Sequence, residues 1–175
     1  MSQGNKRIFS TYQITVIAIL AAIGSILYKL EFVVFPAVPF YKLDLSNLPI
    51  LLGTFSMGPV IGSVILLIKS AVGLFTTTSQ GVGELADFLL GLTMILPVGF
   101  LYRHQKSRGT AILGMAIGGV LATVAGVLLN YFLLIPFFAA LFGMPVDVIV
   151  GMGTNMFPAV DSLWKFVWFV TAPFN

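Results

Sequence analysis

The sequence has little charge and no cysteine. Only 9% of its 175 residues are charged, against about a quarter in a typical soluble domain, while 58% are hydrophobic. A soluble fold of this size cannot bury so much apolar surface. The lack of cysteine excludes disulfides, thiolate metal sites and cysteine nucleophiles. We therefore expect an all-α integral membrane protein, because an open sheet edge cannot be satisfied in lipid.

Enzyme motifs are also missing. The chain has no phosphate-binding G-x-x-x-x-G-K-[ST] motif, which excludes nucleotide hydrolysis by that route. Its one histidine, His104, stands beside Arg103 and is interpreted as a solvated member of a basic loop. No serine, histidine and acid form a recognisable triad. These absences favour a function other than catalysis, with an intramembrane enzyme kept as an alternative.

Five apolar runs predict membrane spans, each of which needs roughly 20 residues. The expected spans are 9–28, 48–58, 60–75, 85–102 and 111–135. Pro136 is expected to end or kink the last of them. The remaining segments are an outer loop at 29–47, a cytoplasmic loop at 103–109, an outer segment at 144–172 and the start of a sixth, truncated helix at about 173.

Basic residues set the expected orientation. Lys6 and Arg7 precede the first span, and Arg103, Lys106 and Arg108 follow the fourth. The positive-inside rule places both groups in the cytoplasm, and the acidic residues then lie on or near the outer side. The net charge of +3 is thereby explained without a nucleic-acid partner. We expect residues 1–175 to form one multi-pass domain with a cytoplasmic amino terminus.

Small residues follow a helical spacing in the first span. They are Thr11, Thr15, Ala18, Ala22 and Ser25. Such a stripe lets a second helix approach closely, since helix association in lipid depends on packing. Spacing alone favours internal packing of this stripe, and docking of a separate membrane subunit is the functional alternative.

The fifth span carries a polar residue on a small-residue face. Gly119, Thr123, Gly126 and Asn130 share that face, which directs Asn130 into the bundle near its outer end. The Asn130 amide can form an interhelical hydrogen bond worth about 1 kcal/mol. It can equally anchor a planar ligand that presents donors and acceptors. Both alternatives stay open.

Lys69 interrupts the third apolar run. An ionised lysine at a helix centre costs roughly 2.5–3.5 kcal/mol in a bilayer. The simplest expectation is that Lys69 extends to the interface. Pairing with Glu84 or Asp87 across the short outer loop is the second alternative, and direct ligand contact is the third.

The stretch "FYKLDLSNLPILLG" concentrates polar groups before the second span. Ser46 or Asn47 can cap that helix, with Pro49 in its first turn. Capping does not explain the other side chains of the loop, Phe35, Phe40, Tyr41 and Asp44. A loop that covers an outer cavity would use them, because aromatic rings cover a flat ligand and polar groups fix its edge.

Four segments resemble one known family. They are "KLDLSNLPILLGTFSMGPVIG", "LLIKSAVGLF…GVGELADFLLG", "LLNYFLLIPFFAALFG" and the terminal "APFN". In this order they resemble the substrate-binding (S) components of energy-coupling-factor (ECF) vitamin transporters, and among these the riboflavin-specific RibU type. The similarity runs from about residue 20 to residue 175, except that the stretch 144–170 is longer than usual.

The resemblance implies a bundle of six transmembrane helices that binds riboflavin beneath the first outer loop, with the sixth helix truncated here. Asn130 and Asn175 carry over as ligand-facing amides, and Asp44 with its neighbours carries over as the gating loop. The expected ligand-binding residues are Asn130, Asn175, Asp44, Leu45, Tyr41, Phe40, Asn47 and Glu84. Asp87 stands where asparagine is often expected, which leaves its role open.

The resemblance also implies partners. Ala18 and Ala22 match the Ala-x-x-x-Ala element by which the family docks its transmembrane coupling subunit, and two ATPase subunits supply the energy. Riboflavin is the transported ligand, no cofactor is implied, and the location is a bacterial cell membrane. The alternatives are an S component for thiamine or a pyridoxine-like vitamin, an intramembrane enzyme, and a purely structural membrane subunit.

Overall fold

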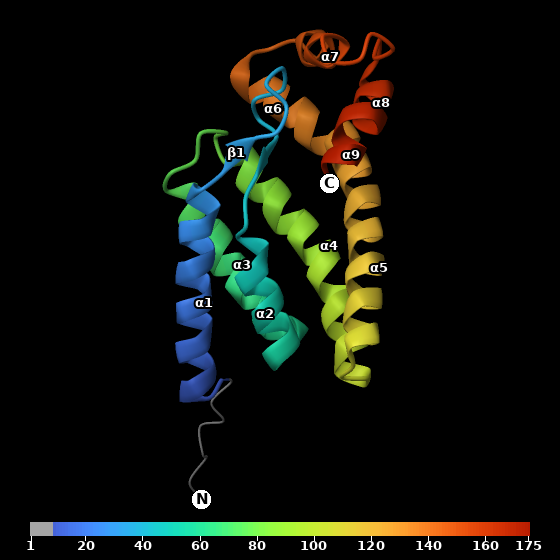
Figure 1. Ribbon diagram of the computed structural model, residues 1–175. Helices are drawn as coiled ribbons and strands as arrows, with labels where there is room; N and C mark the ends of the chain where they lie inside the picture. The colour runs from blue at the N-terminus through green and yellow to red at the C-terminus, as the bar shows by residue number, and fades with distance from the viewer. Residues whose placement is uncertain (1–8) are drawn as a thin grey trace, which may run out of the picture.

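The computed structural model describes residues 9–175 and is mostly helical (Figure 1). Lys6 and Arg7, on which the expected orientation depends, lie outside these residues. The α-helices are α1 (Thr11–Lys29), α2 (Asn47–Met57), α3 (Pro59–Leu74), α4 (Val82–His104), α5 (Arg108–Leu129), α6 (Ile135–Phe142), α7 (Val146–Thr154), α8 (Leu163–Phe166) and α9 (Ala172–Phe174). Two π-helical turns, η1 (Asn130–Leu134) and η2 (Val167–Thr171), connect α5 to α6 and α8 to α9.

Six helical stretches of the described chain are apolar. Three are long enough to cross a bilayer: Thr11–Lys29, Val82–His104 and the continuous Arg108–Phe142. Three are shorter: Asn47–Met57, Pro59–Leu74 and Leu163–Phe174. The expected all-α membrane fold is confirmed, whereas the crossing of all six helices stays a prediction.

Pro136 does not end the fifth helix, so of the two expected effects, an end or a kink, the first is wrong. The π-helical turn η1 precedes it, and α6 continues to Phe142. In a regular α-helix the proline ring clashes with the carbonyl four residues earlier. The wider π turn changes the hydrogen-bond register, so that the Ile135 N–H donates to the Asn130 carbonyl five residues back. The chain can therefore pass through proline without breaking.

The sixth helix begins at Leu163 and not at about 173, so the expected outer segment 144–172 is wrong at its carboxyl end. That segment also contains α7. Asp161 and Lys165 form an exposed ion pair at the helix start. Charged side chains in a first turn can stay in water while the apolar remainder of the helix packs.

The ends of the helices fall at two ends of the bundle (Figure 1). The first outer loop, the α3–α4 loop and α6 to α8 gather at one end, here called the hairpin end. The α2–α3 turn at Gly58 and the short α4–α5 loop lie at the other. Gly58 has φ of 96°, a conformation that favours glycine. The grouping of the loops at these two ends agrees with the sides expected for them relative to one another. Which end is cytoplasmic stays a prediction.

The first outer loop is a folded hairpin. Its strands β1 (Phe32–Val33) and β2 (Lys42–Leu43) pair antiparallel, with Phe32 opposite Leu43. Val38 and Tyr41 from this loop are buried in a core cluster with residues of α5, α6, α7 and the carboxyl-terminal helix. A second core cluster joins α1, α2, α3 and α4. The hairpin is therefore packed against the second half of the chain.

The buried face of α5 agrees with the expected one at Gly126 but not at Gly119 and Thr123. It carries Gly114, Gly118, Ala122 and Gly126, while Gly119 is only half-buried. The packing of α4 against α5 explains why Gly118 is buried. A Cβ added at Gly118 would lie 2.6 Å from the Met94 carbonyl oxygen of α4. Glycine at 118 thus permits close approach of the two helices.

The two adjacent glycines of α5 give a matched test of this packing. We expect Gly118→Ala to lower the free energy of unfolding by about 1–3 kcal/mol, because the new methyl group meets backbone atoms that cannot move independently. Gly119→Ala is the control, since a Cβ there has no neighbour within 4 Å. Thermal unfolding in detergent should show a lower Tm only for the first variant. Equal Tm values would contradict the close α4–α5 approach.

Candidate functional site

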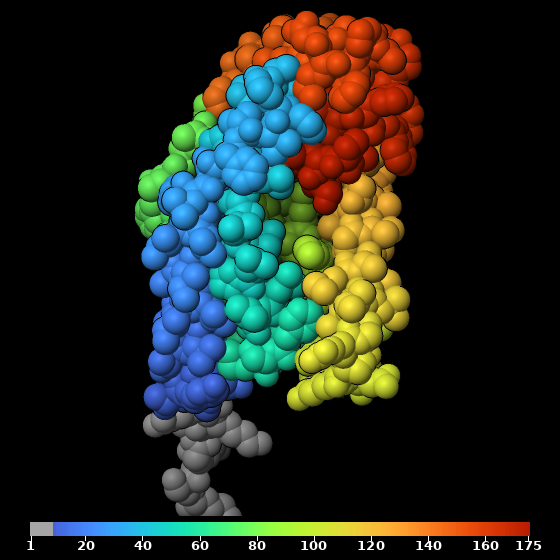
Figure 2. Space-filling view, viewed as in Figure 1, coloured from blue at the N-terminus to red at the C-terminus, as the bar shows by residue number. Residues whose placement is uncertain are grey.

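A cavity of about 610 Å³ lies at the hairpin end. Its walls come from α4 on one side and from α5, η1 and α6 on the other, and the first outer loop closes over it. The space-filling view shows the surface hollowed between α2 and α5, below the carboxyl-terminal segment (Figure 2). Pockets for small organic ligands have volumes of about 300–1,000 Å³, so this cavity can hold one.

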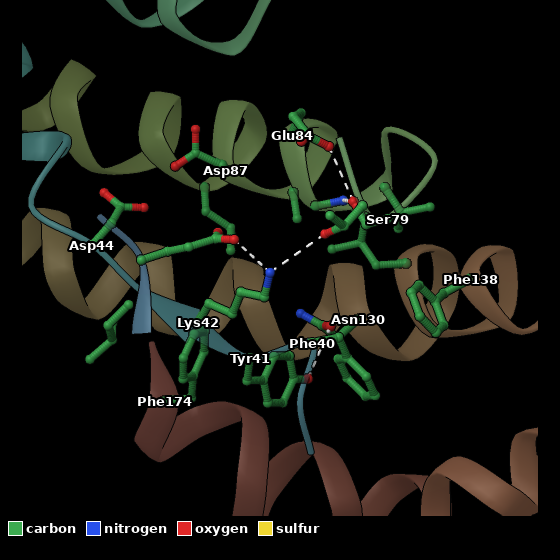
Figure 3. Close-up of a pocket in the computed structure, with 18 of the residues that line it drawn as sticks. Phe40, Tyr41, Lys42, Asp44, Ser79, Glu84, Asp87, Asn130, Phe138 and Phe174 are labelled. Atoms are coloured by element: carbon green, nitrogen blue, oxygen red, sulfur yellow. Dashed lines mark hydrogen bonds and ion pairs between the residues drawn. The ribbon is translucent and has the colours of Figure 1, made fainter. Parts of the chain in front are cut away.

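Aromatic and aliphatic side chains form most of the cavity wall. The aliphatic members include Leu90, Met94, Leu134, Ile135 and Met152. Among the aromatic members, the Phe40 and Phe138 rings lie 5.1 Å apart, and Tyr41 stacks on Phe174 at 4.6 Å (Figure 3). Such walls suit a flat, largely apolar ligand.

Seven of the eight side chains expected to bind ligand line this cavity. They are Phe40, Tyr41, Asp44, Asn47, Glu84, Asn130 and Asn175. Leu45 does not line it and is 58% exposed. The chain bends at Leu45, after β2, and this side chain turns away from the cavity that Asp44 lines. Ligand contact by the seven stays a prediction.

Asn130 is buried at the start of the π-helical turn. Its Nδ2 donates to the Gly126 carbonyl at 2.8 Å, and its Oδ1 accepts from the Tyr41 hydroxyl at 3.2 Å (Figure 3). The Tyr41 hydroxyl also lies 2.6 Å from Thr171 Oγ1. An amide has two N–H groups and two acceptor lone pairs, so Asn130 keeps capacity for a ligand. The protein partners of Asn130 are thus its own helix and the outer loop, not another helix as expected, and ligand binding by its amide stays a prediction.

Tyr41 has a buried, protonated hydroxyl. The hydroxyl comes from the outer loop and is nearly inaccessible, and this loss of solvent raises the pKa of Tyr41 above its usual value. At neutral pH the hydroxyl is thus a hydrogen-bond donor to Asn130. The contact joins the loop over the cavity to the wall below it.

Asn175 lies beside the same stretch of α5. Its Nδ2 donates to the Thr171 carbonyl at 2.9 Å. A Cβ added at Gly126 would come within 2.5 Å of that nitrogen, so glycine at 126 allows the carboxyl-terminal helix to approach. The fold thereby brings together Asn130 and Asn175, two amides from distant parts of the chain, in one cavity wall.

Glu84 is buried in the first turn of α4 and already has several partners. It accepts from Thr77 Oγ1 at 2.8 Å and from the Tyr28 hydroxyl at 3.2 Å. It also accepts from Ser79 Oγ at 3.1 Å (Figure 3). The carboxylate therefore organises the α3–α4 loop. Any ligand contact by Glu84 would be added to this structural role.

Lys42 is a cavity-lining residue that the sequence analysis did not select. Its Nζ lies 2.5 Å from a carboxylate oxygen of Glu31 and 3.5 Å from Thr78 Oγ1, so it connects the hairpin to the α3–α4 loop. Both members of the ion pair are about a quarter to a third exposed, where such pairs contribute roughly 0–1 kcal/mol. Its position between "FY" and "LD" in the polar loop was the available signal.

Lys69 does not extend to the interface. Its side chain is fully buried, pairs with Asp87, and donates to Ser46 Oγ at 3.0 Å. The Tyr28 ring lies 4.9 Å from its Nζ. Ser46 stands at the N-cap of α2 but makes no capping hydrogen bond, so that expectation is wrong as well. A buried charge needs a partner, and Ser46 and Asp87 are the partners here.

Asn47 lines the cavity without a partner for its side-chain oxygen. Its Oδ1 is the only side-chain nitrogen or oxygen atom that is buried and lacks a hydrogen bond in the described part of the chain, residues 9–175. Leaving a buried acceptor unpaired costs about 1–3 kcal/mol.

The small-residue stripe of α1 faces outward. Ala18 and Ala22 are exposed, whereas the buried residues of this helix are Ile17, Ala21 and Gly24. Packing within this chain therefore does not explain the stripe. It is a separate feature from the cavity.

Comparisons with known proteins give one family. Residues 12–175 match the family described as "ECF transporter, substrate-specific component". The chain is 32% identical over 142 residues to the riboflavin transporter RibU of Staphylococcus aureus, covering 81% of this chain and 72% of that protein. It is 30% identical over 128 residues to the riboflavin transporter FmnP of Bacillus subtilis, covering 71% and 67%.

A solved structure agrees with these matches. The S component of a bacterial ECF transporter superposes with a TM-score of 0.68 at 28% sequence identity. The match covers 93% of this chain and 96% of that one. The shared architecture thus extends over nearly the whole length of both chains.

Proposed function

The chain belongs to the family of ECF transporter substrate-specific components, and we propose that it captures riboflavin in the cavity at the hairpin end. Two relatives, each at least 30% identical, are riboflavin transporters. The observation that carries the proposal is the cavity itself, in which three asparagine side chains, Asn47, Asn130 and Asn175, meet walls of aliphatic and aromatic groups.

Riboflavin has the chemistry that such a cavity can satisfy. It is planar, with an imide-like polar edge and a polyhydroxyl tail. Phe40 and Phe138 would cover the ring system, which buries apolar area. The amides would pair with the polar edge and the tail, since each unpaired buried group costs about 1–3 kcal/mol. The remaining acceptor of Asn47 would take a ligand N–H.

The bound state would be closed by the first outer loop. Tyr41 connects the loop to the cavity wall, because it lies in the loop and its hydroxyl donates to Asn130 in the wall. Asp44 and Lys42 would lie at the polar margin of the ligand. This chain would bind and hold the vitamin, and its release into the cell would require other subunits.

Those subunits would be the transmembrane coupling protein and two ATPases of an ECF transporter. The exposed Ala18 and Ala22 on α1 would form the docking face for the coupling protein. The amino terminus would lie in the cytoplasm and the hairpin end outside, so that the cavity meets vitamin from the medium. The protein would act as a transport subunit in the cell membrane, and no catalytic step is assigned to it.

Titration with riboflavin tests the proposal. Purified protein in detergent should quench flavin fluorescence saturably, with one flavin per chain, because stacking on aromatic side chains and exclusion of water alter the excited state. Thiamine and pyridoxine are measured in parallel by their effect on Tm. Binding of one of these vitamins without riboflavin would indicate an S component of another specificity. If no vitamin changes the Tm, a structural subunit would be favoured.

A further inference from the structure

Lys69 contacts two parts of the cavity wall without lining the cavity itself. Its side chain is fully buried. Its ammonium group pairs with Asp87 of α4 and donates to Ser46 Oγ, at the junction of the outer loop with α2. Asp87 and Asn47, the residue after Ser46, both line the cavity. The Lys69 ammonium group therefore connects α4 to the start of α2, and both of these elements have side chains that line the cavity.

Ser46, at the junction of the outer loop with α2, is buried, and its hydroxyl is bonded to Lys69 alone among the described residues. The Ser46 side chain makes no capping bond to α2, and the Ser46 N–H donates to Asp44 Oδ1 at 2.6 Å within the same loop. The hydrogen bond from Lys69 is thus a side-chain link from this junction to another helix. It fixes the start of α2, from which Asn47 directs its unpaired oxygen into a buried position.

Close packing restricts the lysine to this position. A Cβ added at Gly24 of α1 would lie 3.6 Å from Lys69 Cγ and 3.6 Å from the Ser46 carbonyl oxygen, so α1 covers the contact from behind. The Tyr28 ring, at 4.9 Å, faces the ammonium group from the same helix. Since the side chain has no route to solvent, its charge must be balanced by Asp87 and Ser46.

We propose that Lys69 is a positioning residue: it clamps the Ser46–Asn47 end of the outer loop to Asp87 and so slows the departure of bound flavin. Only the slower departure of flavin rests on the proposed riboflavin binding. The clamp itself is a property of the unliganded protein. Without it, the loop end would open more often, and both hydrogen exchange and ligand dissociation would be faster.

Ser46→Ala is the primary test because it removes the hydroxyl and leaves the ion pair intact. The matched control is Ser56→Ala in α2, the helix that Ser46 precedes, because the Ser56 hydroxyl donates only to carbonyls of its own helix. We expect Ser46→Ala to increase amide exchange at residues 45–48 at least about fivefold in the unliganded protein. The flavin dissociation rate should rise about tenfold, as expected for a lost hydrogen bond to a charged group. The control should change neither.

A second variant tests the lysine directly. Lys69→Met combined with Asp87→Asn gives a neutral pair of similar shape, and adding Ser46→Ala to it should cause no further increase in exchange. If the amide exchange rate at residues 45–48 in Ser46→Ala lies within about twofold of the rate in Ser56→Ala, the clamp is overturned, whatever the double variant does. The clamp is also overturned if Ser46→Ala increases exchange as much in the double variant as in the wild type. A confirmed change in exchange without riboflavin binding to the wild type would leave the clamp standing and refute the proposed function.

Discussion

Replacing Asn130 with alanine should raise the riboflavin dissociation constant about tenfold or more, since every 1.4 kcal/mol is a factor of ten. The change removes an amide from the cavity wall. It also leaves the Tyr41 hydroxyl, which now donates to Asn130 Oδ1, with Thr171 as its remaining partner. The ligand group that would pair with the amide then has no partner, and a buried polar group left unpaired costs about 1–3 kcal/mol. Quenching of flavin fluorescence measures the effect.

Two further measurements separate binding from folding. Asn155→Ala makes the same chemical change at an exposed position after α7, and its dissociation constant should equal that of the wild type. The Tm of unliganded Asn130→Ala shows whether the loss of the Gly126 contact has loosened the π-helical turn. A folded Asn130→Ala protein with wild-type affinity would remove this residue from the site.

Hydropathy predicted the helical membrane class because lipid imposes a simple rule. Every backbone group in the bilayer must be paired within the chain, so apolar runs become helices whatever their neighbours. The same simplicity limited the prediction of the sixth helix, whose expected start at about 173 left the charged residue Lys165 outside it. The structure places Lys165 in the exposed first turn of the helix Leu163–Phe174.

The orientation of individual side chains was harder to predict. Spacing on α5 directed Asn130 inward, as observed, yet assigned Gly119 in place of Gly118 to the buried face. One helical position is 100° of rotation, and only the neighbouring α4 decides it. In the same way, Glu84 and Asp87 were both possible partners of Lys69. Their positions differ by three residues on one helix, and the choice of Asp87 depends on how α3 and α4 face each other.

Long-range pairs within the loops had no sequence signal. Lys42 meets Thr78 across 36 positions, and Tyr41 meets Asn130 across 89. The loop was expected to cover a cavity because it mixes aromatic and polar residues. This composition does not predict which of its side chains face the cavity. The outward position of Leu45 illustrates this limit, since its neighbours in the same motif do line the cavity.

The outward stripe on α1 has a consequence in the membrane. Lipid tails are as apolar as leucine, so helices associate there through close backbone approach, which small residues allow. Ala18 and Ala22 are four positions apart and both exposed, with larger exposed side chains such as Ile14 and Ile26 on the same helix. They therefore leave a shallow depression into which a helix of the coupling subunit would fit.

Filling that depression should abolish assembly. We expect Ala18→Leu combined with Ala22→Leu to prevent co-purification of the coupling and ATPase subunits, because two added side chains hold the helices apart. Riboflavin affinity should stay within about twofold of wild type, since neither residue lines the cavity. Ala116→Leu with Val120→Leu enlarges an exposed face of α5 as the control and should leave assembly intact. Full recovery of the complex with the α1 variant would show that this helix face is not where the coupling subunit docks.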